Sequence, residues 1–340
     1  MKNILVTGGT GYIGSHTVVE LLNRDYNVII IDNLSNSKEL VVDRIEQICG
    51  KRPKFYKGDI RSKEDLGRVF SENKIDCVIN FAGLKAVGES VSKPLEYYDN
   101  NIYGAINLLE VMREYNVYNF IFSSSATVYG DPASVPIDES FPVGGTTNPY
   151  GTTKLFIEKI LEDLYASDKR FNIIILRYFN PIGAHKSGLI GEDPNGIPNN
   201  LAPYITQVMI GKRDHLNVFG NDYDTKDGTC IRDYIHVVDL AVGHVLAIKK
   251  FDEKIGLAIY NLGTGKGSTV FDVLHAFEKA YGKDIPYEVV GRRDGDIRAN
   301  YTKVDKAKKE LGFVAERDLD EMAADSWNWQ KHNPNGFEDK

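Results

Sequence analysis

Tyr150 and Lys154 are the residues of this chain whose types and spacing most directly suggest chemistry. On a helix, residues four apart share one face, so the two side chains would lie side by side. An ammonium about 4 to 6 Å from a phenol, at an effective dielectric near 20, favours the phenolate by roughly 3 to 4 kcal/mol. We therefore expect Lys154 to lower the pKa of Tyr150 until the phenolate can act as a base near neutral pH. Two exposed helix residues would give the same spacing.

A glycine-rich segment near the N-terminus supports the chemical interpretation. Gly8, Gly11 and Gly14 follow a first apolar run and open an amphipathic stretch over 12–24, which is the setting of a dinucleotide-binding loop. Without a β-carbon, glycine lets backbone N–H groups approach a pyrophosphate at a helix N-terminus. Asp32 ends the next apolar run, where a carboxylate accepts both hydrogen bonds of the adenosine ribose and repels a 2′-phosphate. The pattern predicts NAD in preference to NADP, and a plain glycine turn is the alternative.

Further polar groups fall where a parallel sheet binds ligands. Serines 123–125 end a predicted strand, and the C-terminal ends of parallel strands form the ligand-binding edge. A hydroxyl there could hydrogen-bond a substrate oxygen and complete a set with Tyr150 and Lys154, although solvation of a strand end is an alternative. Arg232 and Arg293 suit a diphosphate, because a guanidinium binds it through paired hydrogen bonds. Surface salt bridges would explain these arginines equally.

Two other patterns predict no site. Residues 263–268 look like a phosphate-binding loop, but a glycine follows Lys266 where Ser or Thr is required, so we expect an ordinary turn. His236 and His244 lie near Asp239 without metal-ligand spacing, so we expect polar helix residues and no metal.

Charge and composition exclude several classes of protein. The 340 residues carry a formal net charge of -7 without a basic run, which argues against nucleic acid or anionic membranes as partners and favours small molecules. No apolar stretch approaches the ~18 residues of a membrane span and the N-terminus does not resemble a signal peptide, so we expect a cytoplasmic protein. The 3 widely spaced cysteines predict reduced thiols.

Short apolar runs alternate with amphipathic stretches through the first half of the chain. We expect helices over 12–24, 94–115 and 150–166, and helix-starting capping boxes at Ser62 and Thr269. Continuous apolar strands divided by helices predict an α/β protein of the Rossmann type, with a doubly wound parallel sheet. The runs expected to form its strands are 4–6, 28–31, 54–57, 77–80, 119–123 and 173–177.

The composition of the sequence changes near residue 180. Residues 181–235 are rich in Gly, Pro and Asn, as expected of ligand-binding loops. A helix over 238–249 and a strand over 258–261 predict a return to the main sheet, and helices near 269–281, 304–311 and 319–330 predict a smaller α/β lobe. We therefore expect two interleaved units, 1–180 with about 235–262 returning to it, and 181–234 with 263–340.

Longer motifs give the chain a resemblance to a known family. The segments that carry it are 32–37 (DNLSNS), 81–90 (FAGLKAVGES), 123–130 (SSSATVYG), 177–181 (RYFNP), 196–200 (GIPNN), 232–236 (RDYIH) and 325–330 (DSWNWQ). With the glycine loop and the Tyr150/Lys154 pair, they resemble the extended short-chain dehydrogenase/reductases, and within these the UDP-galactose 4-epimerases, over nearly the whole chain. The first unit would then bind NAD and the second a UDP-sugar.

The resemblance implies a redox-neutral isomerisation of UDP-galactose and UDP-glucose in galactose metabolism. Tyr150 would take the proton of the sugar 4-hydroxyl while C4 gives its hydride to NAD, Ser125 would support the same oxygen, and Lys154 would hold the nicotinamide ribose. The 4-keto sugar would turn over in the pocket and recover the hydride on its other face, so NAD should stay bound. Relatives also imply a homodimer built on helices 94–115 and 150–166.

The resemblance also implies two sets of binding residues. The NAD site would be formed by Gly8, Gly11, Tyr12, Ile13, Gly14, Asp32, Asn33, Asn36, Ser37, Asp59, Ile60, Phe81, Ala82, Gly83, Lys85, Asn100, Ser123, Tyr150, Lys154 and Tyr178. The substrate site would be formed by Lys85, Ser125, Tyr150, Asn180, Asn200, Leu201, Asn217, Phe219, Arg232, Tyr234, Arg293, Asp296 and Asn300.

Departures from related patterns bear on the substrate and the reaction. A nucleotide-sugar 4,6-dehydratase resembles Asp-Glu where this chain has Ala126 and Thr127, which cannot do carboxyl acid/base work. A non-catalytic NAD-binding regulator is a second alternative, which the intact catalytic set disfavours. Glucose-only relatives resemble Tyr where this chain has Asn300, so we expect UDP-N-acetylglucosamine and UDP-N-acetylgalactosamine to be accepted as well, unless Tyr301 or a shifted loop fills the space.

Overall fold

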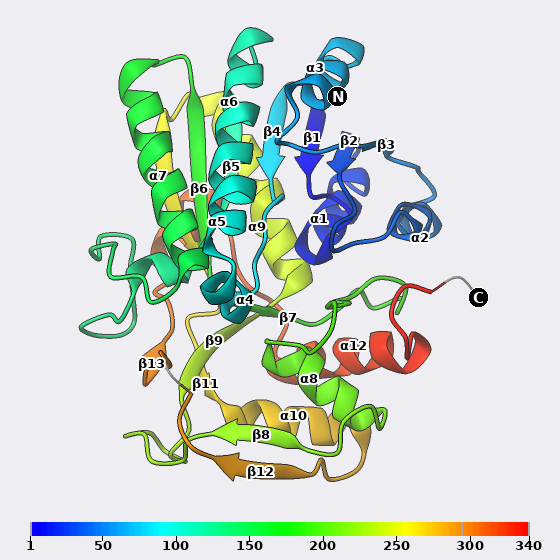
Figure 1. Cartoon of the computed structure of the whole chain (residues 1–340), viewed down its shortest axis with the longest axis vertical. Helices are drawn as coiled ribbons and strands as arrows, with labels where there is room; N and C mark the ends of the chain where they lie inside the picture. The colour runs from blue at the N-terminus through cyan, green and yellow to red at the C-terminus, as the bar shows by residue number, and fades with distance from the viewer. Residues whose placement is uncertain (1, 294, 339–340) are drawn as a thin grey trace.

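The centre of the fold is a seven-stranded parallel sheet in the order β10-β6-β5-β4-β1-β2-β3 (Figure 1). It is seen in a computed structural model that describes residues 2–293 and 295–338. The strand order reverses between β1 and β4, which is the switch point of a Rossmann fold, so the predicted doubly wound sheet is confirmed. The strands are β1 (Asn3–Thr7), β2 (Asn27–Asp32), β3 (Lys54–Lys57), β4 (Cys77–Asn80), β5 (Asn119–Ser125), β6 (Asn172–Tyr178) and β10 (Leu257–Leu262).

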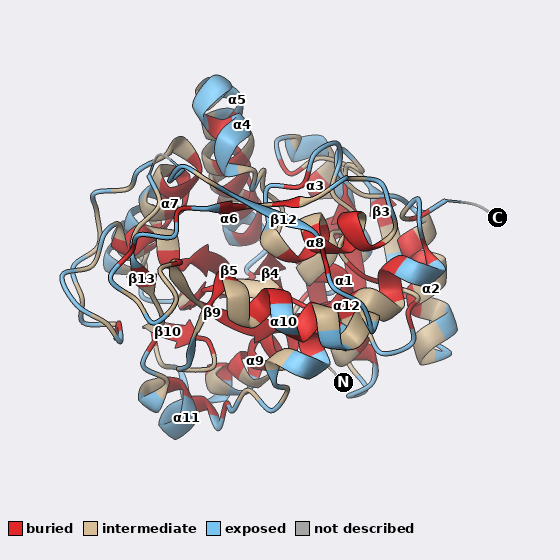
Figure 2. Ribbon diagram, turned by 90° about the horizontal axis from the view of Figure 1, so that it is seen from below, coloured by how far each residue is buried: buried red, intermediate tan, exposed pale blue. Residues whose placement is uncertain are grey.

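Alternating residues of these strands build one apolar core on each face of the sheet. Ile4 and Val6 pack into one core, whereas Leu5 between them packs into the other. Both faces are thereby buried, as the red strands in Figure 2 show. The first core is covered by α1 (Tyr12–Leu22), α2 (Leu40–Cys49) and α9 (Val237–Lys250), and the second by α3 (Lys63–Glu72), α6 (Gly104–Glu114) and α7 (Pro149–Ser167).

A smaller lobe lies beyond the C-terminal ends of the main strands (Figure 1). Its central strand, β9 (Ile231–His236), pairs in parallel with β7 and β13 and antiparallel with β11, while β8 and β12 form a separate parallel pair. The other elements are β7 (Asn180–Ile182), β8 (Leu216–Phe219), β11 (Gly267–Thr269), β12 (Tyr287–Val290), β13 (Ala299–Asn300), α8 (Leu201–Met209), α10 (Val270–Tyr281), α11 (Asp305–Leu311) and α12 (Leu319–His332). Helices α8, α10 and α12 share a third apolar core with these strands.

The chain crosses between the two parts more than once. After β9, helix α9 packs against α1 and strand β10 pairs with β6 in the main sheet. We propose that 1–180 with about 235–262 forms one unit and that 181–234 with 263–340 forms the other. No helix in the described part of the chain is long and apolar enough to span a membrane.

Two segments differ from the sequence-based expectation. Residues 181–235 contain β7, α8, β8 and β9 besides loops; strands of 3 to 6 residues are too short to give a clear periodic pattern. The helix expected over 94–115 is divided into α5 (Pro94–Tyr97), a π-helical turn η1 (Tyr98–Tyr103) and α6. The wide turn brings Asn101 inward, where its Oδ1 accepts a hydrogen bond from Leu84 N at 2.8 Å. Its Nδ2 donates to Thr153 Oγ1 on α7 at 3.0 Å, which ties this turn to the helix of Tyr150.

Helix caps also position the ligand-binding edge. Thr269 forms the full capping box that the sequence predicts. Ser62 forms only half of one: its Oγ accepts from Asp65 N at 3.1 Å, but the Asp65 carboxylate accepts from Asp59 N at 3.0 Å. The hydrogen bond from Asp59 N to the Asp65 carboxylate thus fixes the loop after β3, which carries two of the predicted NAD residues.

Candidate active site

The residues predicted to bind NAD gather at one edge of the main sheet. They lie in the loops after β1, β2, β3 and β4, at the ends of β2, β5 and β6, in the first turn of α1, or on η1 and α7 beside that edge. Parallel strands place all these ends together (Figure 1). Their individual roles in binding remain a proposal.

The glycine loop has the geometry of an anion site. Gly8 has a φ of +68°, and a Cβ there would lie 2.7 Å from Ala82 N on the neighbouring loop. A Cβ on Gly14 would lie 2.3 Å from Gly8 O, so neither position admits a side chain. Gly11 caps α1 without a side-chain hydrogen bond, and the first turn holds no acidic residue. The first N–H groups of the helix can therefore bind a pyrophosphate.

Asp32 holds the neighbouring loop and keeps room for a ligand. Its carboxylate accepts hydrogen bonds from Thr10 N at 3.1 Å, Leu34 N at 2.9 Å and Ser37 Oγ at 3.1 Å. A carboxylate has about four acceptor positions, so one remains for a ribose hydroxyl, fewer than the two that the sequence suggests. Asp32 is buried, and its negative charge disfavours a 2′-phosphate.

Ser125, Tyr150 and Lys154 meet at the same edge. Ser125 ends β5, where its Oγ accepts a hydrogen bond from Thr127 N at 3.2 Å, and its hydroxyl lies close enough to the phenol of Tyr150 to act on the pKa of that group. Asn148 caps α7 by accepting a hydrogen bond from Gly151 N at 2.9 Å, which places Tyr150 in the first turn. Lys154, one turn later, lies with its Nζ 5.8 Å from the Tyr150 ring centroid. All three residues are buried.

The charge state of this set differs from the expectation. Burial raises the pKa of Tyr150 to about 12, and the nearby Ser125 hydroxyl offsets this only in part. The Lys154 ammonium donates to Ser123 O at 2.7 Å, and burial lowers its pKa to about 8 against the opposing charge of Glu158. The prediction that Lys154 brings the Tyr150 pKa near neutrality is thus wrong for the protein alone, because burial of the phenol dominates and raises its pKa.

One acidic side chain joins the predicted NAD and substrate residues. Glu192 Oε1 accepts hydrogen bonds from Lys85 Nζ at 2.8 Å and from Asn200 Nδ2 at 3.1 Å. The same Lys85 Nζ lies 5.5 Å from the ring centroid of Tyr12 in the glycine loop. Sequence reasoning missed Glu192, since it lies in an irregular loop with no pattern to mark it.

The two arginines predicted to bind a diphosphate are brought together. Asp296 bridges them, at 3.3 Å from Arg232 and 2.9 Å from Arg293. Arg293 also lies over the ring of Phe219, with its guanidinium carbon 5.7 Å from the centroid. Two cations share one carboxylate, so the cluster keeps a net positive charge suited to an anion.

Strand register places most of the remaining predicted substrate residues. Asn300 stands opposite Arg232, and Asn180 stands opposite Tyr234. Asn200 and Leu201 begin α8. Asn217 lies two residues before Phe219 on β8, and in the described part of the chain no side-chain hydrogen bond joins it to the other predicted substrate residues.

Buried polar atoms without a partner in the described residues include Thr127 Oγ1, Tyr223 OH and Asn300 Oδ1. Buried polar groups are nearly always hydrogen-bonded, so these atoms suit a ligand rich in hydroxyl and N–H groups. Asn300 was predicted. Thr127 stands within the SSSATVYG segment, which could have marked it, whereas Tyr223 carries no sequence signal.

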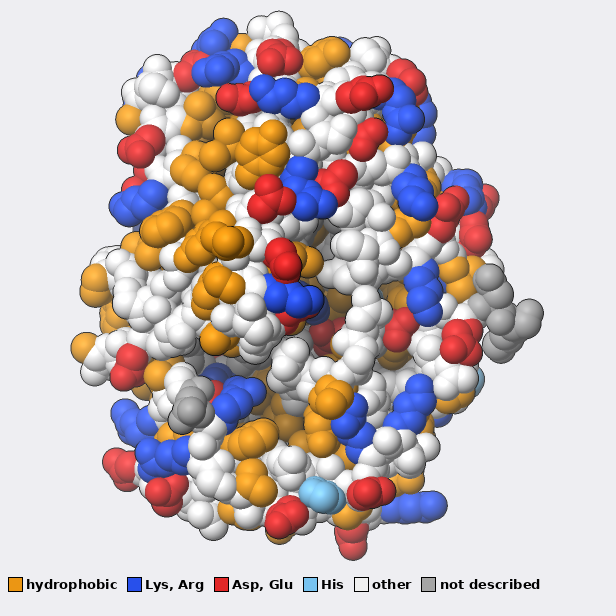
Figure 3. All heavy atoms as spheres, in the orientation of Figure 1, with side chains coloured by type: hydrophobic (Ala, Val, Ile, Leu, Met, Phe, Trp, Pro, Cys, Tyr) orange, Lys and Arg blue, Asp and Glu red, His pale blue; other side chains and the backbone are white. Residues whose placement is uncertain are grey.

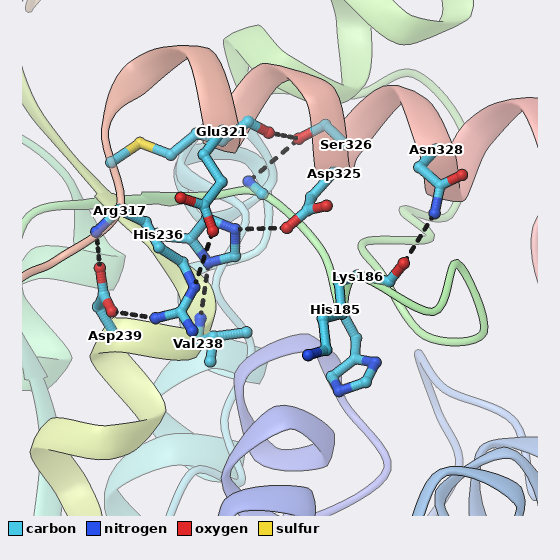
Figure 4. Close-up of polar contacts among 12 residues, drawn as sticks. His185, Lys186, His236, Val238, Asp239, Arg317, Glu321, Asp325, Ser326 and Asn328 are labelled. Atoms are coloured by element: carbon cyan, nitrogen blue, oxygen red, sulfur yellow. Dashed lines mark hydrogen bonds and ion pairs between the residues drawn. The ribbon is translucent and has the colours of Figure 1, made fainter.

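Polar contacts join α12 to the end of β9 and to the loop after β7 (Figure 4). His236 ends β9 and caps α9, and its Nε2 lies 3.2 Å from Asp325 Oδ2. Ser326 Oγ accepts a hydrogen bond from Gly183 N at 3.1 Å, and Gly183 O accepts one from Tyr12 OH at 2.7 Å. Thus His236 is a strand residue and not the helix residue expected. The described residues contain no cluster of three potential metal ligands.

Comparisons with known proteins agree with this geometry. The family model described as GDP-mannose 4,6 dehydratase matches residues 5–326. The chain is 60% identical to the UDP-glucose 4-epimerase of Haemophilus influenzae, over 99% of both chains, and 57% identical to that of Bacillus subtilis, over 98% of both. The crystal structure of UDP-glucose 4-epimerase from Bifidobacterium longum in complex with NAD+ and UDP superimposes with a TM-score of 0.96 at 58% identity, covering 99% of this chain and all of that one.

Matches of this extent and identity show more than a shared fold. The full-length relatives agree with one another in name, and the family model spans both the sheet and the smaller lobe. The chain belongs to the UDP-glucose 4-epimerase family of the extended short-chain dehydrogenase/reductases.

Proposed function

We propose that this chain catalyses the reversible 4-epimerisation of UDP-galactose and UDP-glucose with bound NAD. The observation that carries the proposal is the buried Ser125–Tyr150–Lys154 set, which lies at the sheet edge where the glycine loop also opens. Membership of the epimerase family supports the choice of reaction and substrate.

The residues of the sheet edge fit NAD. The first turn of α1 offers unpaired N–H groups, and Asp32 keeps one acceptor position and a charge that disfavours a 2′-phosphate. When bound, NAD would supply a hydride acceptor and a positive charge on its nicotinamide ring. Tyr150 needs such a charge, because burial alone raises its pKa to about 12.

The protein groups would then act on one sugar oxygen. The Tyr150 Oη would accept the proton of the 4-hydroxyl, and Ser125, which lies beside the phenol, would hydrogen-bond the same oxygen. Lys154, anchored on Ser123 O, would hold the ribose beside the reacting carbon and favour the phenolate. Return of the hydride to the other face of C4, with the proton of Tyr150 going back to the 4-oxygen, would complete the cycle without net redox change.

The arginine cluster would anchor the substrate during rotation of the keto sugar. Arg232 and Arg293 share Asp296 and keep a net positive charge for the diphosphate. The sugar could then present either face while its UDP part stays fixed. Thr127, with its partnerless hydroxyl, would line the sugar pocket.

The chain does not favour the alternatives. A 4,6-dehydratase needs carboxyl groups after the serine run, where Ala126 and Thr127 stand and carry no acid or base. A non-catalytic regulator would have no need of an intact, buried Ser125–Tyr150–Lys154 set.

Replacing Tyr150 by phenylalanine tests the proposal. The variant keeps the ring but lacks the proton acceptor, so kcat for UDP-galactose should fall by roughly 10² or more. Tyr165→Phe, on the same helix, serves as the matched control. Nucleotide released on denaturation should be NAD in both proteins. Turnover near the wild-type rate in Tyr150→Phe, release of NADP only, or stoichiometric NADH formation would refute the mechanism.

We also propose that N-acetylated UDP-hexoses are substrates. Asn300 carries a buried, partnerless Oδ1 in the described structure and could hydrogen-bond an acetamido N–H. Tyr301, an alternative filler of this space, packs beside Gly267, where a Cβ would lie 3.1 Å from its ring.

We further propose a homodimer in the cytoplasm. Exposed apolar side chains gather over α4 (Val87–Ser92), α5, η1 and α7, where Figure 3 shows a hydrophobic area. The residues are Val87, Val91, Leu95, Tyr103 and Phe156. A second copy of the chain would cover a patch of this kind. The three cysteines are all free thiols, which supports a reducing compartment.

A further inference from the structure

A buried ion pair lies one helical turn beyond Lys154 and takes no part in the steps above. Arg177 on β6 binds the Glu158 carboxylate through two of its nitrogens, at 3.0 and 2.6 Å, and both side chains are about 3% exposed or less. Ser124 Oγ donates to Glu158 Oε1 at 2.6 Å. Arg177 also donates to Tyr129 OH at 2.9 Å.

Stability alone is a weak reason for such a pair. Desolvation of two buried charges often cancels their attraction, and well-packed apolar residues can replace them without loss. The position of the pair is more informative. Glu158 binds the middle one of three serines at the end of β5, between Ser123, whose carbonyl holds Lys154, and Ser125, which lies beside Tyr150. The carboxylate therefore fixes the strand end on which the catalytic set is mounted.

Charge balance around Lys154 depends on the same carboxylate. The titratable groups near Tyr150 and Lys154 are Glu158 on α7, Arg177 and Tyr178 on β6, Tyr129 after β5 and Tyr97 on α5. Glu158 is the anion of this set, and it neutralises Arg177. Without it, the buried Arg177 would lose the carboxylate that neutralises it, and Lys154 would lose the anion that favours its ammonium.

We propose that Glu158 is a positioning residue of the epimerisation: by binding Ser124 and Arg177 it fixes the end of β5 that holds Lys154 and Ser125, and it balances the charge of Arg177. The inference rests on the proposed function. Glu158 does not touch substrate or cofactor; it acts through Lys154 and the strand.

The test is the pH profile of kcat for Glu158→Gln, which keeps the shape of the side chain and removes its charge. The loss of an anion makes the Lys154 ammonium less favourable, so the alkaline limb should move to lower pH by roughly 1 to 2 units. Misplacement of the set should lower kcat by roughly 10- to 100-fold with little change in KM. Glu162→Gln, an exposed change on the same helix, should show the wild-type profile.

Two further variants separate charge from structure. Glu158→Gln/Arg177→Met removes the unbalanced cation, so its alkaline limb should return toward the wild-type position while kcat stays low. Ser124→Ala keeps the ion pair and should lower kcat without moving the limb; it also serves if Glu158→Gln does not fold, as judged by circular dichroism and retained NAD.

The outcomes are distinct. Absence of UDP-galactose turnover in the wild type would refute the proposed function. If the wild type turns over UDP-galactose but Glu158→Gln changes neither kcat nor the pH of the alkaline limb, the positioning role alone is refuted. If the alkaline limb lies at the same pH in the single and the double variant, the charge balance is refuted. If neither Glu158 variant folds, an unaltered kcat in Ser124→Ala overturns the inference.

Discussion

The buried ammonium of Lys154 should lower the free energy of unfolding of the protein. Burial lowers the pKa of its ammonium from 10.5 to about 8, and one pKa unit corresponds to 1.36 kcal/mol, so the charged form costs about 3 kcal/mol of folding free energy. Methionine has a similar length and no charge. Lys154→Met leaves the Ser123 carbonyl without its donor, at a cost of about 1 to 3 kcal/mol. We therefore expect the free energy of unfolding at pH 7 to rise by up to about 2 kcal/mol, while kcat falls by roughly 10² or more.

The sign of the pH dependence makes this prediction specific. The folded pKa of Lys154, about 8, lies below the unfolded value of 10.5. Between these values the unfolded chain binds more protons, so the Lys154 contribution to stability rises with pH across this window. Below pH 8 the penalty is fully present, and above 10.5 it is absent. The advantage of Lys154→Met should therefore be largest below pH 8 and shrink as the pH approaches 10.5.

Urea unfolding of wild type and variant at pH 7 and pH 10 measures both effects. The proteins are compared after removal of nucleotide, because a ligand lost by one of them would alter apparent stability. Lys159→Met, an exposed change on the same helix, should show no pH-dependent difference from the wild type. A Lys154→Met protein that is less stable than the wild type at pH 7, or whose advantage does not shrink at pH 10, would refute the reasoning.

Three further outcomes are expected. Burial lowers the pKa of His16 from 6.5 to about 3, so the free energy of unfolding should fall as the pH drops below 6.5, by about 2 kcal/mol at pH 5. His16→Asn, whose amide nitrogen can still reach Tyr12 O, should lose this contribution when urea unfolding is measured at pH 7 and pH 5. An equal change in the free energy of unfolding between these pH values in wild type and variant would contradict the prediction. Asn300→Tyr should lower kcat/KM for UDP-N-acetylglucosamine more than for UDP-galactose, since a larger ring narrows the pocket; an unchanged ratio would show that position 300 is not the gate. Leu95 is 80% exposed, and Leu95→Asp should convert a dimer into a monomer by light scattering at micromolar concentration; a surviving dimer would move the interface elsewhere.

The cofactor half of the site was predictable because its signals are local. Gly8 and Gly14 are required by contacts within one turn and its neighbouring loop, and Asp32 ends a strand whose apolar run is plain in the sequence. Once β1 and β2 are parallel neighbours, both motifs must open at one edge. Pattern and topology together therefore determine this part of the site.

The rest depends on packing that no local pattern records. Arg232 and Arg293 are far apart in the chain, and their shared contact with Asp296 follows from the pairing of β13 with β9. Glu192, which accepts hydrogen bonds from Lys85 and Asn200, lies in an irregular loop that no sequence pattern marks. The pKa of Tyr150 was predicted to fall, whereas it rises. The prediction considered the neighbouring ammonium but not burial of the phenol, which depends on the whole fold.

The serine run at the end of β5 shows how one motif serves two purposes. Side chains alternate across a strand, so Ser124 shares its face with Phe122 and turns toward α7, where it meets Glu158. Ser123 and Ser125 turn the other way, where Ser123 Oγ is hydrogen-bonded to Tyr178 OH and Ser125 lies beside Tyr150. The position of each serine along β5 therefore decides whether it faces the proposed catalytic residues, as Ser125 does, or the supporting carboxylate of Glu158, as Ser124 does. A one-residue slip of β5 would exchange these roles, which is why the carboxylate that locks the strand matters to the chemistry on its other face.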